Sequence, residues 1–178
     1  MRAGLDVAHS RRDTLWAPWR MAYISKAEKM TGCLFCHVRR TRIDKPNLVL
    51  ARRDNALLML NRFPYNPGHV MVAVNRHVAK FGDLREEERN ALMDLTALAE
   101  DVLASEYGPH GMNYGANVGR VAGAGYPGHL HMHLVPRWKG DTNFMPAIAE
   151  TKVLPESLGR TWSRLRRAVR EREKAGRR

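Results

Sequence analysis

The sequence predicts an α+β fold with an antiparallel sheet of about five strands, a long helix and a C-terminal helix. Short apolar segments with turn residues between them follow one another along the chain, as is typical of strands in hairpin order. Segments with apolar residues three and four positions apart lie among them and indicate amphipathic helices. The chain has 178 residues, of which 44% are hydrophobic, and this suits one globular domain. It contains no apolar run of about eighteen residues, so we expect no membrane span.

The first three strands are expected at residues 48–52, 56–61 and 69–74. Residues 54–55 are Asp and Asn, which suit the turn between the first two strands. Residues 62–68 include two prolines, an asparagine and a glycine, and therefore predict a loop. The third strand is apolar enough to lie at the centre of the sheet.

The long helix is expected from about Arg85 to Tyr107, with Asp83 as its N-cap. Residues 86–88 are glutamates, which the helix dipole favours in the first turn. Residues 111–118 predict a fourth strand. The apolar face of the helix consists of Leu92, Leu95, Leu98, Ala99, Val102 and Leu103.

The fifth strand is expected at residues 129–136, where histidine and apolar residues alternate. Because strand side chains point alternately to opposite faces, one face carries imidazoles and the other packs on the core. Imidazoles aligned in this way take part in catalysis, bind a metal or form hydrogen bonds with one another. Residues 119–128 form a glycine-rich loop of the kind that cradles phosphates. The imidazoles belong to His129, His131 and His133, and the apolar residues are Leu130, Met132 and Leu134.

The chain divides into an N-terminal arm (1–31), a central domain (32–153) and a basic C-terminal helix (154–178). Within the arm, Pro18 suits the first turn of a short helix. Residues 32–37 predict a tight knuckle and residues 39–46 a basic loop. The C-terminal helix is expected to start at Pro155. Its apolar face consists of Leu158, Trp162, Leu165 and Val169.

The formal charge of +12 and the pI near 10.4 indicate polyanion partners, either nucleic acid or phosphate-rich small molecules. A nucleic-acid-binding surface predicts aromatic residues interleaved with basic ones. No such stripe is evident, so nucleic acid is the less favoured partner. The N-terminal residues lack the apolar segment of a secretory signal, and we therefore expect a cytoplasmic protein.

The two cysteines, Cys33 and Cys36, have the C-x-x-C spacing of half a zinc site. A cytoplasmic setting disfavours a structural disulfide, although free thiols or a redox pair remain alternatives. His37 is adjacent and competes as a ligand. The isolated His9 and His110 are expected to be solvent-facing.

Residues 129–135 match the HφHφHφφ signature, and the chain thus resembles the histidine triad (HIT) superfamily of nucleotide hydrolases and transferases. His69, preceded by Pro67 and Gly68, matches the upstream histidine of that family. The resemblance extends from about Cys33 to Pro136. Two flanking segments, 16–20 and 137–144, are similar to the bacterial branch with diadenosine tetraphosphate phosphorylases and hydrolases.

The resemblance implies a HIT-like fold, a two-fold homodimer with the 85–107 helix at its interface, and cleavage of dinucleoside polyphosphates at the α-phosphate. His131 would be the nucleophile that forms a nucleotidyl-histidine intermediate. His133 and His69 would form the supporting hydrogen-bond network. Either water or inorganic phosphate would complete the reaction. A nucleoside phosphoramidate hydrolase and a nucleic-acid-binding protein with a structural zinc are the alternatives.

The resemblance also implies the substrate contacts. Asn61 matches the ribose-binding position, while Asn117 and Gly123 resemble the phosphate-contacting strand and loop. Many members have Gly-Gln-Ser/Thr shortly before the triad, but this chain has Ala124-Gly125-Tyr126-Pro127-Gly128. Phosphate contacts are therefore expected from the backbone or from Tyr126. The substrate-binding residues are thus expected to be Asn61, Asn117, Gly123, Gly125, Tyr126 and His133.

By the same resemblance, the remaining ligands of the zinc would be His77 and His129, which with the two cysteines make a closed structural site. No organic cofactor is expected. A catalytic metal held by the three triad histidines is disfavoured, because alternate residues of one strand lie about 7 Å apart. This spacing is awkward for a single ion with bonds near 2 Å.

Overall fold

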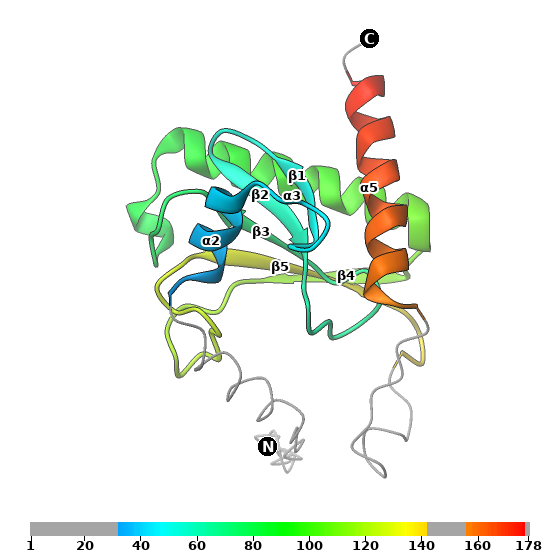
Figure 1. Ribbon diagram of the computed structural model, residues 1–178. Helices are drawn as coiled ribbons and strands as arrows, with labels where there is room; N and C mark the ends of the chain where they lie inside the picture. The colour runs from blue at the N-terminus through cyan, green and yellow to red at the C-terminus, as the bar shows by residue number, and fades with distance from the viewer. Residues whose placement is uncertain (1–31, 142–155, 177–178) are drawn as a thin grey trace, which may run out of the picture.

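The computed structural model describes residues 32–141 and 156–176 (Figure 1). The short helix expected around Pro18 lies outside the described residues. None of the described helices is long and apolar enough to cross a membrane.

A five-stranded sheet forms the centre of the molecule and confirms the expected α+β fold (Figure 1). Its strand order is β1-β2-β3-β5-β4, and every neighbouring pair is antiparallel. The strands are β1 (Val49–Arg52), β2 (Ala56–Leu60), β3 (Val70–Val74), β4 (Gly111–Gly115) and β5 (His131–Arg137).

Helices cover both faces of the sheet, which explains why β2 and β3 are buried along their whole length. Helix α3 and helix α5 pack on one face, where the larger apolar cluster includes Leu134. A smaller cluster on the other face contains Phe35 and Val38. The helical elements are α2 (Leu34–Thr41), the 3-10 turn η1 (Phe81–Asp83), α3 (Glu86–Tyr107) and α5 (Leu158–Ala175).

The expected knuckle at residues 32–37 is wrong, because helix α2 begins immediately after Cys33. The helix continues to Thr41, so residues 39–41 are helical rather than part of a loop. Phe35 and Val38 are fully buried and anchor this short helix against the sheet. The two cysteines are thereby placed at the start and in the first turn of a packed helix.

The N-cap of α3 is Arg85 rather than Asp83, which belongs to η1. Glu88 accepts a hydrogen bond of 2.9 Å from the backbone N–H of Arg85, so a side chain inside the first turn caps the helix. The same carboxylate pairs with Arg76 at 2.6 Å, which lowers the pKa of Glu88 to about 2. The apolar face of α3 packs on its own sheet and is therefore not available for a dimer interface.

Two strands are shorter than expected. Strand β4 ends at Gly115 rather than at residue 118. Strand β5 begins at His131. The backbone N–H groups of His129 and Leu130 donate to loop carbonyls rather than to a neighbouring strand, and that of Leu130 donates to Val78. The alternation nevertheless holds, since Leu130 and Leu134 lie in the larger core.

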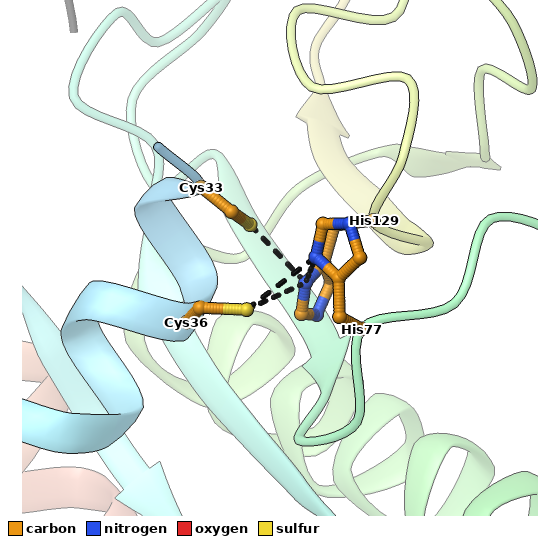
Figure 2. Close-up of side chains that lie close together, drawn as sticks. All are labelled: Cys33, Cys36, His77 and His129. Atoms are coloured by element: carbon orange, nitrogen blue, oxygen red, sulfur yellow. Dashed lines mark hydrogen bonds between the residues drawn. The ribbon is translucent and has the colours of Figure 1, made fainter. Parts of the chain in front are cut away.

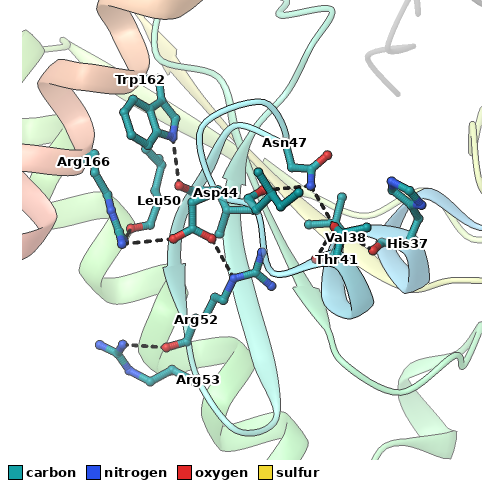
Figure 3. A network of polar contacts seen from close by, with 12 residues as sticks. His37, Val38, Thr41, Asp44, Asn47, Leu50, Arg52, Arg53, Trp162 and Arg166 are labelled. Carbon is teal, nitrogen blue, oxygen red and sulfur yellow. Dashed lines mark hydrogen bonds and ion pairs between the residues drawn. The ribbon is translucent and has the colours of Figure 1, made fainter.

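The C-terminal helix α5 is attached to strand β1 through polar contacts as well as apolar ones (Figure 3). The Trp162 indole donates to the backbone carbonyl of Val49 at 2.9 Å. The Asp44 carboxylate bridges Arg52, at 2.8 Å, and Arg166, at 3.2 Å. These contacts fix the helix across the outer strand of the sheet. Its buried side chains are Thr161, Leu165, Ala168 and Val169.

Candidate functional site

Four side chains far apart in sequence meet at one end of the sheet (Figure 2). Cys33 and Cys36 come from the start of α2, His77 follows β3, and His129 precedes β5. Their nearest sulfur and nitrogen atoms all lie within 4.8 Å of one another. Both cysteines are free thiols, and the adjacent His37 is not part of the group.

The geometry of this group fits a tetrahedral metal ion. The Cys33 Sγ–His129 Nδ1 and Cys36 Sγ–His77 Nδ1 distances are 3.2 and 3.4 Å, and the two Nδ1 atoms are 3.3 Å apart. Tetrahedral zinc bonds imply about 3.5 Å between sulfur and nitrogen ligands and about 3.3 Å between two nitrogens. These residues could therefore hold a metal ion with little rearrangement.

The protonation state of His129 also suits a ligand. Its Nε2 lies 2.7 Å from the carbonyl oxygen of Val74, so Nε2–H donates and Nδ1 presents a lone pair toward the cysteines. Burial lowers the pKa of His129 to about 4. The imidazole is therefore neutral at pH 7, as a metal ligand must be.

His131 is held in a single orientation and tautomer. Its Nδ1 lies 2.8 Å from the backbone carbonyl oxygen of His129, so Nδ1–H donates and Nε2 carries the lone pair. The residue is 4% exposed, and burial lowers its pKa. Phe35 packs on the ring with a centroid distance of 4.8 Å. A fixed neutral tautomer is the form that attacks phosphorus.

His133 and His69 form a hydrogen-bonded pair whose direction can be deduced. The backbone N–H of Tyr65 donates to Nδ1 of His69 at 3.0 Å, so the proton of neutral His69 lies on Nε2. This atom is 3.0 Å from Nδ1 of His133, which must accept. The proton of His133 therefore lies on Nε2 and can be donated to a substrate. Burial, followed by the nearby His131, lowers the pKa of His133 to about 4.

The expected substrate-binding residues are only partly brought together. Asn61 lies beside His69, with its Nδ2 3.4 Å from Nε2 of the imidazole. Asn117 lines the same pocket as His133. Gly123, in the loop, has a positive φ of 87°, and its carbonyl oxygen lies 3.4 Å from Nδ2 of Asn117. Gly125 and Tyr126 belong to that loop, and the Tyr126 ring packs edge-on against Phe35 at 5.8 Å.

A pocket of about 360 Å³ opens beside His133, and several of its residues were not predicted. Arg137 is held by Asp141, with a shortest distance of 2.6 Å, and by Asn113 at 2.8 Å. The Arg137 guanidinium holds the pKa of Asp141 well below its usual range. The strand alternation could have identified Arg137, because it continues the histidine face of β5. The pocket residues missed from the sequence are Tyr65, Asn66, Asn113, Tyr114, Gly115, Val135, Arg137 and Asp141.

Comparison with known proteins identifies the family. The HIT domain matches residues 42–140. The chain belongs to the HIT domain family. It is 39% identical over 152 residues to the AP-4-A phosphorylase of Mycobacterium tuberculosis. The matched region covers 81% of this chain and 77% of that protein. It is 31% identical to a bis(5'-nucleosyl)-tetraphosphatase of Schizosaccharomyces pombe, over 52% of this chain and 50% of that protein.

Solved structures confirm the HIT fold. A Zn-bound histidine triad family protein from Mycobacterium smegmatis superposes with a TM-score of 0.64 at 20% identity, covering 81% of this chain and 97% of that one. A histidine triad nucleotide-binding protein from Sulfolobus tokodaii gives a TM-score of 0.63 at 20% identity, covering 78% of this chain and 93% of that one. The expected superfamily and fold are thus both confirmed.

Proposed function

We propose that this HIT protein is an enzyme that cleaves dinucleoside polyphosphates, such as diadenosine tetraphosphate, at the α-phosphate through a nucleotidyl-histidine intermediate. The names of its relatives, an AP-4-A phosphorylase and a bis(5'-nucleosyl)-tetraphosphatase, support this substrate class. The observation that carries the mechanism is the bond from His131 Nδ1–H to the His129 carbonyl. It leaves Nε2 of His131 as an oriented nucleophile beside the proton-donating His133.

In the first step, Nε2 of His131 forms a bond to the α-phosphorus. The bond from phosphorus to the bridging oxygen breaks, and the leaving nucleotide takes the electron pair. Nε2–H of His133 donates to that oxygen as its negative charge develops. His69 supports His133 through the 3.0 Å bond to its Nδ1.

In the second step, an acceptor attacks the phosphorus of the nucleotidyl-histidine, and Nε2 of His131 leaves as a neutral imidazole. Attack by water releases a nucleoside monophosphate, and attack by inorganic phosphate releases a nucleoside diphosphate. The AP-4-A phosphorylase relative at 39% identity supports phosphate as the acceptor. Asn61, Asn117, Gly123, Gly125 and Tyr126 are proposed as substrate contacts together with His133.

The metal proposed for Cys33, Cys36, His77 and His129 is zinc. The ligand set and distances support it, and thiolate with imidazole is a donor set that zinc prefers. A closed four-ligand site of this kind is structural, so it would stabilise the attachment of α2 to the sheet. We also propose a cytoplasmic location, because a reducing compartment would keep both thiols available to bind the metal.

A two-fold homodimer is also proposed. Within the described ranges, the outer edge of β4 pairs with no strand, and an open edge invites pairing with a second copy. Met93 on α3 and Tyr114 on β4 are large apolar residues with 56% and 46% exposure. This exposed side of α3, rather than its buried apolar face, would lie at the interface.

A substrate panel assayed with and without inorganic phosphate tests the proposed reaction. It should contain dinucleoside polyphosphates of different lengths and adenosine phosphoramidate. With diadenosine tetraphosphate and isotopically labelled phosphate, we expect ATP together with ADP whose β-phosphate carries the label. Hydrolysis would instead give ATP and AMP. Two molecules of unlabelled ADP, or turnover of the phosphoramidate alone, would contradict the proposed function.

A further inference from the structure

We propose that the exposed face of helix α5 binds double-stranded nucleic acid through contacts with the phosphate backbone. This binding activity is additional to the proposed enzymatic function and does not depend on it. The HIT domain match ends at residue 140, whereas α5 begins at Leu158, so the binding surface lies outside that domain. Seven of the 18 residues of α5 are arginine or lysine, and only two are glutamate.

The cations of α5 form a row on the side of the helix that faces away from the core. Leu165 and Val169 are buried and hold the opposite side against the larger apolar cluster. Four exposed cations share the outer side, because the helix has about 3.6 residues per turn. At about 1.5 Å per residue, the row is roughly 21 Å long. These residues, which we call the α5 basic face, are Arg160, Arg167, Arg170 and Lys174.

Most of the α5 basic face is free of ion pairs. Only Arg167 has a carboxylate nearby, that of Glu171 at 4.0 Å, and both of these side chains are exposed. The second acidic residue of the helix, Glu173, pairs with Arg53 at 2.6 Å. Among the residues that the structure describes, no carboxylate lies at ion-pair distance from the other three cations. Their charges are therefore available to an external anion.

The loop before β1 adds a further cation beside this helix. Lys45 is exposed, and its Nζ lies 6.0 Å from the ring centroid of Trp162 on α5. The adjacent Asp44 is already paired with Arg52 and with Arg166 (Figure 3). The carboxylate next to Lys45 is thus neutralised within the fold, and Lys45 extends the positive surface of α5.

The rest of the helix surface favours a duplex over a membrane or a single strand. A membrane-surface helix needs an apolar face to insert, but none of the large apolar side chains found exposed in the described ranges belongs to α5. Single-strand sites use aromatic rings on which bases stack, whereas Trp162 is half-buried and bonded to the Val49 carbonyl. Contacts with a duplex backbone need neither feature, and roughly 21 Å of duplex carries about 12 phosphates.

The test measures the affinity of the full chain for a fluorescent DNA duplex of about 20 base pairs, by anisotropy, at salt concentrations from about 50 to 200 mM. The variant is Arg170→Gln with Lys174→Gln, which removes two exposed charges and keeps good helix formers. We expect its affinity to fall about tenfold or more at the lowest salt concentration. The slope of log K against log salt should decrease in magnitude by about two, since each phosphate contact contributes about 0.9.

The matched control is Lys80→Gln with Arg120→Gln, which removes the same charge from exposed residues before η1 and in the glycine-rich loop. It should keep nearly the wild-type affinity and slope. An RNA duplex of the same sequence should also bind through the α5 basic face, and the tighter of the two duplexes identifies the source of the phosphates.

An equal loss of affinity in the control variant, or no binding of either duplex by the wild-type protein, would overturn the proposal. Binding only to single strands or to phosphatidylserine vesicles would also overturn it. The α5 variant should cleave diadenosine tetraphosphate at the wild-type rate, because α5 packs on α3 and β1 while His131 and His133 lie on β5. A wild-type protein that binds duplexes through α5 but cleaves no dinucleotide would refute the proposed function alone.

Discussion

The backbone carbonyl of His129 accepts the Nδ1–H of His131 at 2.8 Å, while the His129 ring belongs to the Cys₂His₂ group. One residue thus contributes its side chain to the candidate metal site, and its backbone carbonyl orients the proposed nucleophile. Phe35, which lies between the two cysteines in sequence, packs on both rings at 4.9 and 4.8 Å. Any change in the metal site should therefore be transmitted to His131 over a short distance.

Replacing Cys33 by Ser should release the metal and lower the melting temperature by several degrees or more, because the binding free energy of a structural metal contributes to folding. Metal content by elemental analysis and thermal unfolding provide the measurements. His37→Ala is the matched control, since His37 is exposed on the same helix and outside the cluster. Protein purified without chelators that contains no zinc would refute the assignment.

The acid limb of kcat/KM should lie well below pH 6.5. Burial lowers the pKa of His133 to about 4, so His133 stays neutral until the pH falls toward that value. Protonation would then place a hydrogen on Nδ1, facing Nε2–H of His69, and break the pair. The pH profile for a dinucleoside polyphosphate measures this, and an acid limb centred near 6.5 would contradict the deduced proton positions.

Fold stability should respond to pH over a related interval. A histidine in the unfolded chain takes up a proton below about pH 6.5, whereas folded His133 resists protonation down to about 4. The unfolded state therefore binds more protons between these values, and stability falls as the pH is lowered. Denaturant unfolding at several pH values should show this loss of unfolding free energy. The kinetic pH profile should be measured only at pH values at which the enzyme stays folded.

His133→Ala should lower kcat by about 10²–10⁴-fold, the typical contribution of a positioned proton donor. Tyr65 N–H still orients His69 in that variant, so the fold should be retained. The loss of kcat should be smaller with adenosine 5′-phosphorofluoridate than with a dinucleoside polyphosphate, because a fluoride leaving group needs no proton. An equal loss of kcat on these two substrates would show that His133 does not serve the leaving group.

Leu165→Ala should destabilise the protein by about 2–5 kcal/mol, because it creates a cavity where α5 meets the core. Urea unfolding measures this change. Arg167→Ala on the exposed side of the same helix is the control and should lie within about 0.5 kcal/mol of wild type. Equal stability of the two variants would show that α5 is not part of the cooperative fold.

Local patterns predicted the strands, the long helix and the HIT resemblance, because alternation and helical spacing report which face is buried. The ends of elements were less predictable. Glu88 caps the helix in place of Asp83, and Arg76 also holds its carboxylate. The metal ligand set came from the resemblance, since no local pattern brings His77 to the cysteines. The structure places all four residues together.

The pocket beside His133 was not predicted from sequence. Its residues come from two strands and three loop segments, and only tertiary packing brings Asp141 to Asn66, 75 positions away. Asn66 was assigned to a loop, but it is 5% exposed and donates to the Pro136 carbonyl at 2.9 Å. Asn66 therefore stabilises the fold through a hydrogen bond to a residue seventy positions away, which no local sequence pattern could indicate.

Covalent trapping on His131 tests the mechanism most directly. The enzyme is mixed with a dinucleoside polyphosphate labelled at the α-phosphate, quenched at alkaline pH, digested and examined for labelled peptides. We expect the label on His131, its loss in acid, and no labelled protein with His131→Ala, whose kcat should fall by several orders of magnitude. Full activity of His131→Ala, or label on another residue of the wild-type enzyme, would contradict the account.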